Sequence, residues 1–234
     1  LRELIDHYDA GIRIVDDALG RVVAALEQRG LLERTILIVT ADHGEEFLEH
    51  GRFLHTQLRP ELLRVPLVLR LPDGAAAGLR RQDPVSHADL VPTVLDLLGL
   101  EHGDELEGVS LVPLLRGEPL PQRALFFSST EQSGEFRVLE TGILDAGRQL
   151  VRRVSRRCEA ERRAPELLAL DVEEPGGGKG TVPVAPDDSA YTPLIRLLDA
   201  WLAGAEGPAA GAAPTVPLDD EERRRLEALG YLGP

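Results

Sequence analysis

Apolar residues near the start of the chain recur at spacings of three and four, the period of an amphipathic helix. The pattern spans residues 3–29, and Gly30 follows it, where a left-handed residue commonly ends a helix. The apolar positions are Leu4, Ile5, Tyr8, Ile12, Val15, Leu19, Val22, Val23 and Leu26. The first part of the chain is therefore predicted to form one long helix with a single apolar face.

Two mostly apolar runs without polar alternation come next, at residues 35–40 and 65–71. Runs without alternation are typical of strands buried on both faces, as in a parallel sheet covered by helices. A helical pattern returns at residues 90–98, with Asp89 as the expected N-cap and Gly99 as the stop. This order of helix, strand, strand and helix predicts an α/β fold.

The second half of the chain has a different pattern of apolar and polar residues. Residues 124–128, 136–145 and 149–154 are short strand-like runs separated by turn residues, which predicts an antiparallel meander. Arginines crowd the last of these runs, and we interpret them as a solvated face or an edge guard. Residues 173–188 are rich in Gly, Pro and acidic side chains and are predicted to form a loop, and the leucines of 194–202 predict a short helix.

These patterns predict three parts. Residues 1–117 are expected to form part of an α/β domain with a parallel or mixed sheet and flanking helices. Residues 118–203 are expected to form a small α+β subdomain, an antiparallel sheet with a packing helix. Residues 204–234 are expected to form a flexible linker and a terminal helix, because Ala, Gly and Pro dominate before a run of acidic and then basic residues.

Composition narrows the choice of partners. The 234 residues include 26 Lys or Arg and 40 Asp or Glu, a formal net charge of −14 that disfavours binding to nucleic acid. We find no apolar run near the roughly 18 residues that a membrane-spanning helix needs. The chain contains no Met and opens at Leu1, so we expect it to be part of a longer protein.

The most informative residues are Asp42, His43 and Gly44, which directly follow the first apolar run. Ligands of open α/β sheets gather beyond the carboxyl ends of the strands. A carboxylate and an imidazole can bind one divalent ion there if the backbone turns sharply, as glycine permits. An Asp-His pair also occurs in ordinary turns and helix caps, so the pair by itself leaves both readings open.

Two further histidines, His50 and His55, follow within the next twelve residues. For His50, a surface role and a role in a site are equally compatible with the sequence. His87 precedes Asp89 and is interpreted as a helix-entry residue. His7 and His102 are assigned structural roles.

Several motifs in this order resemble those of the sulfatase family, within the alkaline phosphatase superfamily. They are TILIVTADHGEE at 35–46, LLRVPLVL at 62–69, VSHADLVPTVLDLLG at 85–99, EGVSLVPLLRG at 107–117 and LGYLG at 229–233. The resemblance covers residues 1 to about 117 closely and is loose between 118 and 218. It implies a partial alkaline-phosphatase-like α/β fold, and hydrolysis of sulfate esters by a metal-dependent mechanism in the intact parent protein.

The resemblance also assigns residues. It implies that Asp42 and His43 bind a divalent cation, most commonly Ca²⁺, with Mn²⁺ or Zn²⁺ as alternatives. It implies that His55, eleven residues before Pro66, binds the sulfate and protonates the leaving oxygen, since the only lysine, Lys179, lies far from the motif. The family nucleophile, a formylglycine matured from a C/S-x-P-S-R motif, has no counterpart here, because Cys158 lies between arginine and glutamate. We therefore expect residues 1–234 alone to be inactive.

Other functions stay open at this stage. Related superfamily members hydrolyse phosphodiesters or phosphonates, or transfer phosphoethanolamine, and a truncated, noncatalytic scaffold is also compatible with these residues. For the sulfatase reading, the expected partner is a small-molecule or glycan sulfate ester. Many family members are exported, so the resemblance is compatible with a periplasmic or extracellular parent.

Overall fold

The computed structural model describes the chain except residues 56, 104, 134–135, 158–163, 174–178 and 206–234. It divides into two compact units, Leu1–Ile195 and Arg196–Pro234. The predicted boundaries after residues 117 and 203 stay predictions. The predicted terminal helix and Cys158 lie outside the described residues. Among the described residues, no helix is both long enough and apolar enough to cross a membrane.

Helix α1 (Arg2–Gln28) forms where the apolar repeat predicts it, and Gly30 follows with a positive φ of 64°. None of its residues is buried, although its stripe carries large apolar side chains. Leu4, Tyr8, Ile12, Val15 and Val22 are all exposed. The ring of Tyr8 meets the ring of Phe47 edge to face, with centroids 5.1 Å apart, so the helix contacts the loop region beyond the first strand.

The two apolar runs form strands β1 (Leu37–Thr40) and β4 (Leu67–Arg70) after the short 3-10 turn η1 (Leu32–Arg34). They pair antiparallel, with Val39 opposite Val68, so the expected parallel arrangement of this pair is wrong. The expected burial on both faces is also wrong, because β1 is only half-buried and Val68 is exposed. An apolar run reports a tendency to be buried, but it does not encode strand direction.

The connection between β1 and β4 explains the direction. It holds only the two-residue strands β2 (Glu46–Phe47) and β3 (Phe53–Leu54), which pair with each other, and the one-turn helix α2 (Pro60–Leu63). The connection is long enough for a parallel crossover, but parallel neighbours are usually joined by a full helix that packs on the sheet, and the described residues between β1 and β4 form no helix longer than α2. The chain instead returns in the opposite direction, and this connection carries His50 and His55.

Beyond β4 the chain forms two short 3-10 turns, η2 (Pro72–Gly74) and η3 (His87–Asp89), and then the helices α3 (Leu90–Leu97) and α4 (Val112–Leu115). Gly99 ends α3 with a positive φ, as predicted. Asp89 occupies the predicted N-cap position of α3, but its side chain makes no cap bond to this helix. Its carboxylate instead belongs to the preceding turn η3, where Ser86 is the N-cap and Asp89 is the third residue.

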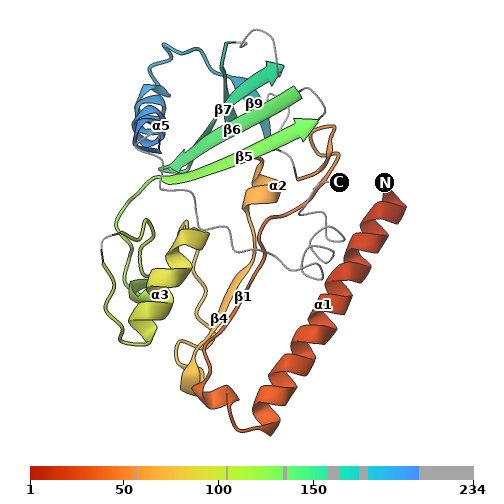
Figure 1. The fold of residues 1–234 in the computed structure, drawn as a ribbon, viewed down its shortest axis with the longest axis vertical. Helices are drawn as coiled ribbons and strands as arrows, with labels where there is room; N and C mark the ends of the chain where they lie inside the picture. Colours follow the sequence, from red (N-terminus) through yellow and green to blue (C-terminus); the bar gives the residue numbers. More distant parts are fainter. Residues whose placement is uncertain (56, 104, 134–135, 158–163, 174–178, 206–234) are drawn as a thin grey trace, which may run out of the picture. The chain divides into compact units, whose positions relative to one another are not determined.

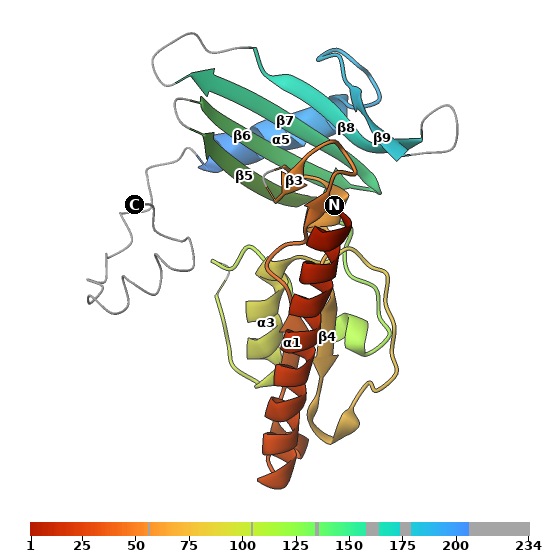
Figure 2. The same cartoon turned by 90° about the vertical axis from the view of Figure 1, so that its right-hand side faces the viewer.

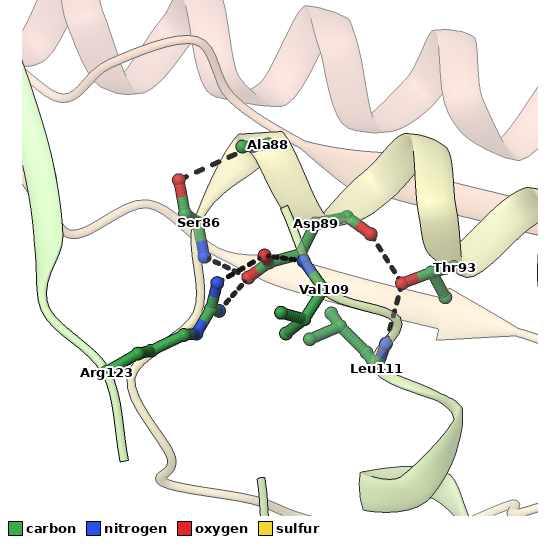
Figure 3. A network of polar contacts seen from close by, with 7 residues as sticks. All are labelled: Ser86, Ala88, Asp89, Thr93, Val109, Leu111 and Arg123. Atoms are coloured by element: carbon green, nitrogen blue, oxygen red, sulfur yellow. Dashed lines mark hydrogen bonds and ion pairs between the residues drawn. The ribbon is translucent and has the colours of Figure 1, made fainter. Parts of the chain in front are cut away.

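The Asp89 carboxylate is fully buried in a polar network (Figure 3). One oxygen accepts from the Ser86 N–H at 2.7 Å, the other accepts from the Val109 N–H at 2.9 Å, and the Arg123 guanidinium donates to both. Burial alone would raise the pKa of Asp89, but the Arg123 pair and the two N–H bonds outweigh it and lower the pKa. Asp89 thereby joins three segments of the chain.

Thr93, one turn later on α3, extends the same network (Figure 3). Its hydroxyl donates to the Asp89 carbonyl at 2.5 Å and accepts from the Leu111 N–H at 2.8 Å. The segment before α4 is thus tied to α3 by backbone and side-chain bonds together. The two motifs that resemble consecutive family segments, 85–99 and 107–117, therefore contact each other directly.

The remaining strands form one antiparallel sheet in the order β5-β6-β7-β8-β9 (Figures 1 and 2). Their bounds are Leu125–Ser133, Phe136–Asp145, Arg148–Arg157, Glu166–Glu173 and Lys179–Pro183. The first three strands confirm the predicted meander. The expected loop at 173–188 is wrong in part, because it contains β9.

The arginine-rich strand β7 is the middle strand of this sheet, so of the two interpretations of its arginines the edge guard is wrong. Its residues Leu150 and Val151 are both buried, which means that both faces of the sheet are covered at this point. Arg153 pairs with the buried carboxylate of Glu140 on β6. Helix α5 (Thr192–Ala205) forms where the leucine pattern predicts a helix and runs across the boundary of the two units.

Together these elements confirm the predicted α/β class, with two short antiparallel strand pairs and flanking helices followed by a five-stranded antiparallel sheet.

Candidate functional site

The end of β1 is fixed from a distant part of the chain. Ala41 directly follows the strand, and its carbonyl accepts a hydrogen bond of 2.9 Å from Nε2 of His87. His87 is the first residue of η3, which confirms its predicted place at a helix entry. Its side chain also holds the residue that precedes Asp42, a contact that spans 46 positions.

Gly44 is required for a different reason from the one that its sequence context suggests. Its φ is not in the left-handed region, and its N–H donates to the Leu62 carbonyl at 2.8 Å. A Cβ built at Gly44 would lie 1.9 Å from the Glu61 carbonyl oxygen. The absence of a side chain therefore allows the backbone after Asp42 and His43 to pack directly against α2.

Asp42 and His43 face each other on the surface. The His43 backbone N–H donates to Oδ1 of Asp42 at 2.9 Å, and this bond lowers the pKa of the Asp42 carboxyl below its usual range. The other carboxylate oxygen, Oδ2, lies 3.6 Å from Nε2 of His43. The side chain of Asp42 is 75% exposed and that of His43 is 43% exposed, so both are accessible to a ligand.

The His43 ring has a defined tautomer in this arrangement. Its Nδ1 lies 2.8 Å from the carbonyl oxygen of Gly44. A carbonyl can only accept, so Nδ1 carries a hydrogen, and in the neutral ring the lone pair is then on Nε2. This backbone anchoring of the second ring nitrogen is the usual way in which proteins orient a metal-binding histidine.

The pair has the donor chemistry of a partial cation site. Protein ligands bind divalent cations at about 2.0–2.6 Å, so an oxygen and a nitrogen 3.6 Å apart can bind one ion. Within the described ranges, no group of three or more His, Cys, Asp or Glu side chains is arranged to hold a metal. Asp42 and His43 thus fit two positions of a shell, and their role as ligands stays a prediction.

His55 lies directly beside this pair. Its ring stacks on the ring of His43, with centroids 4.1 Å apart and an angle of 27° between the planes. Its Nδ1 lies 3.4 Å from Oε2 of Glu45, and its side chain is 47% exposed. The structure therefore brings together all three residues that the resemblance assigns to the site, although His55 is twelve residues away from His43.

His50 has partners elsewhere in the same loop. Its Nε2 lies 3.3 Å from Oε2 of Glu61, and its N–H donates to Oε1 of the buried Glu46 at 3.0 Å. Of the two roles that the sequence leaves open for His50, these contacts favour the structural one.

Glu45 and His87 are the neighbours of the site that sequence reasoning does not identify. Glu45 stands two residues after His43, but nothing in the spacing indicates that it faces His55. The contact of His87 with Ala41 depends on tertiary structure and leaves no local signal. Cys158, which does not lie in a nucleophile motif, is outside the described residues.

Known proteins resemble this chain in sequence and in fold. Residues 2–100 match the family model described as Sulfatase. Arylsulfatase K from Danio rerio is 37% identical over 115 residues, which are 49% of this chain and 22% of the relative. The chain thus spans about a fifth of the length of the curated relatives that it matches.

Two solved structures share the fold. One is a protein in complex with its substrate D-glucosamine-2-N,6-O-disulfate (TM-score 0.58, 23% identity, 83% of this chain and 38% of that one). The other is a phosphonate monoester hydrolase from Silicibacter pomeroyi (TM-score 0.59, 24% identity, 89% of this chain and 42% of that one). At these identities, both similarities concern the fold.

Proposed function

We propose that this chain is part of a sulfatase-family protein that hydrolyses sulfate esters, with Asp42 and His43 as two ligands of a divalent cation. One observation carries the proposal: Oδ2 of Asp42 and the lone-pair nitrogen of His43 face each other at 3.6 Å, with His55 stacked on His43. A carboxylate, a neutral imidazole and a second imidazole at one strand end support charge neutralisation on an oxyanion.

Asp42 and His43 would hold the cation in the states that the structure gives them. The hydrogen bond from the His43 N–H keeps Asp42 ionised, and the bond from Nδ1 to Gly44 leaves Nε2 free to ligate. When bound, a divalent cation supplies positive charge to the sulfate oxygens. Family resemblance favours Ca²⁺, while the nitrogen ligand is also compatible with Mn²⁺ or Zn²⁺.

His55 would act as the general acid. Its Nδ1–H faces Glu45, so Nε2–H is the group left to bind a sulfate oxygen and to protonate the departing alkoxide. Glu45, whose side chain is mostly buried, lies on the Nδ1 side of the ring. His43 and His55 thereby take different roles, a neutral ligand and a proton donor.

The nucleophile is proposed to come from the rest of the protein. Residues 1–234 contain no C/S-x-P-S-R motif, the source of the formylglycine expected for this family. The 234-residue chain alone is therefore expected to turn over no sulfate ester. For the whole protein, the relative solved with a disulfated glucosamine supports a sulfated glycan or small-molecule sulfate ester as substrate.

The substrate class is tested with the full-length protein and a matched series of aryl esters. We expect kcat/KM to be highest for the aryl sulfate. The shared fold with a phosphonate monoester hydrolase makes phosphonate hydrolysis the second candidate. A higher kcat/KM for the aryl phosphonate would support that candidate over the first.

The His55→Ala variant of the full-length protein tests the acid role. Loss of a general acid costs about 10²–10⁴-fold in rate, and the loss is largest when the leaving oxygen needs a proton. We expect kcat to fall strongly for an alkyl sulfate and much less for 4-nitrophenyl sulfate. His50→Ala is the matched control, because His50 lies in the same loop but pairs with Glu61. An equal effect of His55→Ala on both leaving groups would contradict the acid role.

A further inference from the structure

A buried charged cluster joins the segment after His55 to the antiparallel sheet. Glu140 of β6 is only 2% exposed, and its Oε2 accepts from the backbone N–H of Leu58 at 2.6 Å. Arg153 of β7 stands opposite Glu140 in the sheet and donates from Nε to Oε1 at 2.7 Å. The Glu140–Arg153 pair thus binds a loop backbone that is 82 residues away in sequence.

Gln57 completes the cluster from the loop side. Its side-chain oxygen accepts from Nη2 of Arg153 at 2.9 Å and from Nη2 of Arg59 at 3.3 Å. Gln57 and Arg59 are both buried, and Arg59 also donates to the Thr181 hydroxyl on β9. Three consecutive residues of the loop are therefore bonded to three strands of the sheet.

Leu58, between the two polar anchors, packs into the apolar surface of the sheet. It forms a buried cluster with Val151 and Leu170. Gly142 gives the space for this contact, because a Cβ there would lie 2.5 Å from the Phe127 ring and 3.3 Å from Leu58. Apolar packing tolerates small shifts, whereas buried hydrogen bonds to charged groups require one position.

By contrast, His55 itself is held weakly. It is half exposed, its bond to Glu45 is long at 3.4 Å, and its other contact is the stacked ring of His43. Exposed contacts of this kind contribute little to a fixed position. His55 lies between two fixed segments: β3, which ends at Leu54 and pairs with β2, and the anchored segment that begins at Gln57.

We propose that the Glu140–Arg153 pair is a positioning device for His55. It fixes residues 57–59 against the sheet and so sets the His55 ring on His43. Glu140 and Arg153 touch neither substrate nor cation, and they act through the loop. The C-terminal sheet would then contribute to the site without carrying a residue of it, an inference whose functional meaning rests on the role proposed for His55.

The test uses the 234-residue chain with isotope-labelled histidines. The readouts are the NOE between the ring protons of His43 and His55 and the ring ¹³C shift of His55. We expect Glu140→Ala to abolish the NOE and to shift His55 but not His7 or His102. Glu140→Gln should retain the NOE, because its amide oxygen can still accept from the Leu58 N–H.

Leu150→Ala is the matched control for stability. Leu150 is fully buried on β7 and, by strand alternation, faces away from Arg153. It should lower stability and keep the NOE. If circular dichroism shows that Glu140→Ala is unfolded, Arg153→Met becomes the deciding variant. We expect Arg153→Met to abolish the NOE. A retained NOE in the deciding variant, or an equal loss in Leu150→Ala, overturns the proposal.

This readout is independent of the proposed activity. Should His55 have no catalytic role, His55→Ala would leave turnover intact while the NOE pattern above still holds. Should the positioning role fail, the NOE would survive in Glu140→Ala, whatever the effect of His55→Ala on turnover.

Discussion

Asp89→Ala is expected to lower the free energy of unfolding of the 234-residue chain by about 3–5 kcal/mol, the usual cost of breaking a buried ion pair from one side. The variant leaves the Arg123 guanidinium without its carboxylate and removes the acceptor of the Ser86 and Val109 N–H groups. A loss of this size is a large part of the stability of an ordinary domain. The check is the midpoint of urea unfolding, followed by circular dichroism.

Two variants serve as controls for this result. Asp89→Asn keeps an oxygen that can accept from the N–H groups and should cost less. Asp17→Ala removes the carboxylate of the exposed pair between Arg13 and Asp17 on α1, which is worth less than about 1 kcal/mol. The central role of the network would be wrong if Asp89→Ala cost no more than Asp17→Ala.

The same network predicts a pH dependence. The pKa of Asp89 is lower in the folded chain than in the unfolded chain, so its ionisation stabilises the fold at neutral pH. This contribution is present above the unfolded pKa of about 4 and is lost as the pH falls through the lower folded pKa. The stability difference between the wild type and Asp89→Asn should therefore shrink in acid.

Asp42→Ala is expected to reduce kcat/KM of the full-length protein by more than about 100-fold, because removal of one preorganised electrostatic partner of the transition state already costs about 10²–10³-fold. The variant deletes the proposed oxygen ligand and also the acceptor of the His43 N–H. Steady-state rates on an aryl sulfate, measured with and without added Ca²⁺, give the result.

Asp42→Asn separates the two effects of that change. The amide oxygen can still accept from the His43 N–H, so the turn is preserved while the charge is lost. We expect activity close to that of Asp42→Ala and partial recovery at high cation concentration. Asp16→Ala on α1 is the control for loss of an exposed carboxylate. Turnover that persists in Asp42→Ala would remove Asp42 from the ligand shell.

Local sequence patterns predict the elements better than their arrangement. The helices α1 and α3 follow from apolar spacing and from Gly30 and Gly99, since these signals lie within a few residues of one another. The direction of β4 relative to β1 depends on how the chain between them folds, and an apolar run carries no such information. The strand β9 is missed because the segment that contains it is rich in glycine and is predicted to form a loop.

The residues of the candidate site are predicted partly from the local sequence and partly from family resemblance. The position of Asp42 and His43 beyond a strand follows from the residues themselves, while the place of His55 follows from family resemblance. The supporting contacts, from His87 to Ala41 and from Glu140 to Leu58, join residues 46 and 82 positions apart. Such contacts arise from tertiary packing, so no local sequence pattern predicts them.

Paramagnetic broadening by Mn²⁺ shows directly whether Asp42 and His43 bind one divalent cation. Mn²⁺ is titrated into the labelled 234-residue chain, and the NMR signals are followed residue by residue, with Asp42→Asn as the control. We expect the broadening to start at Asp42, His43 and His55 and to be strongly reduced in Asp42→Asn. Broadening that begins elsewhere, or that is unchanged in Asp42→Asn, would contradict cation binding by Asp42 and His43.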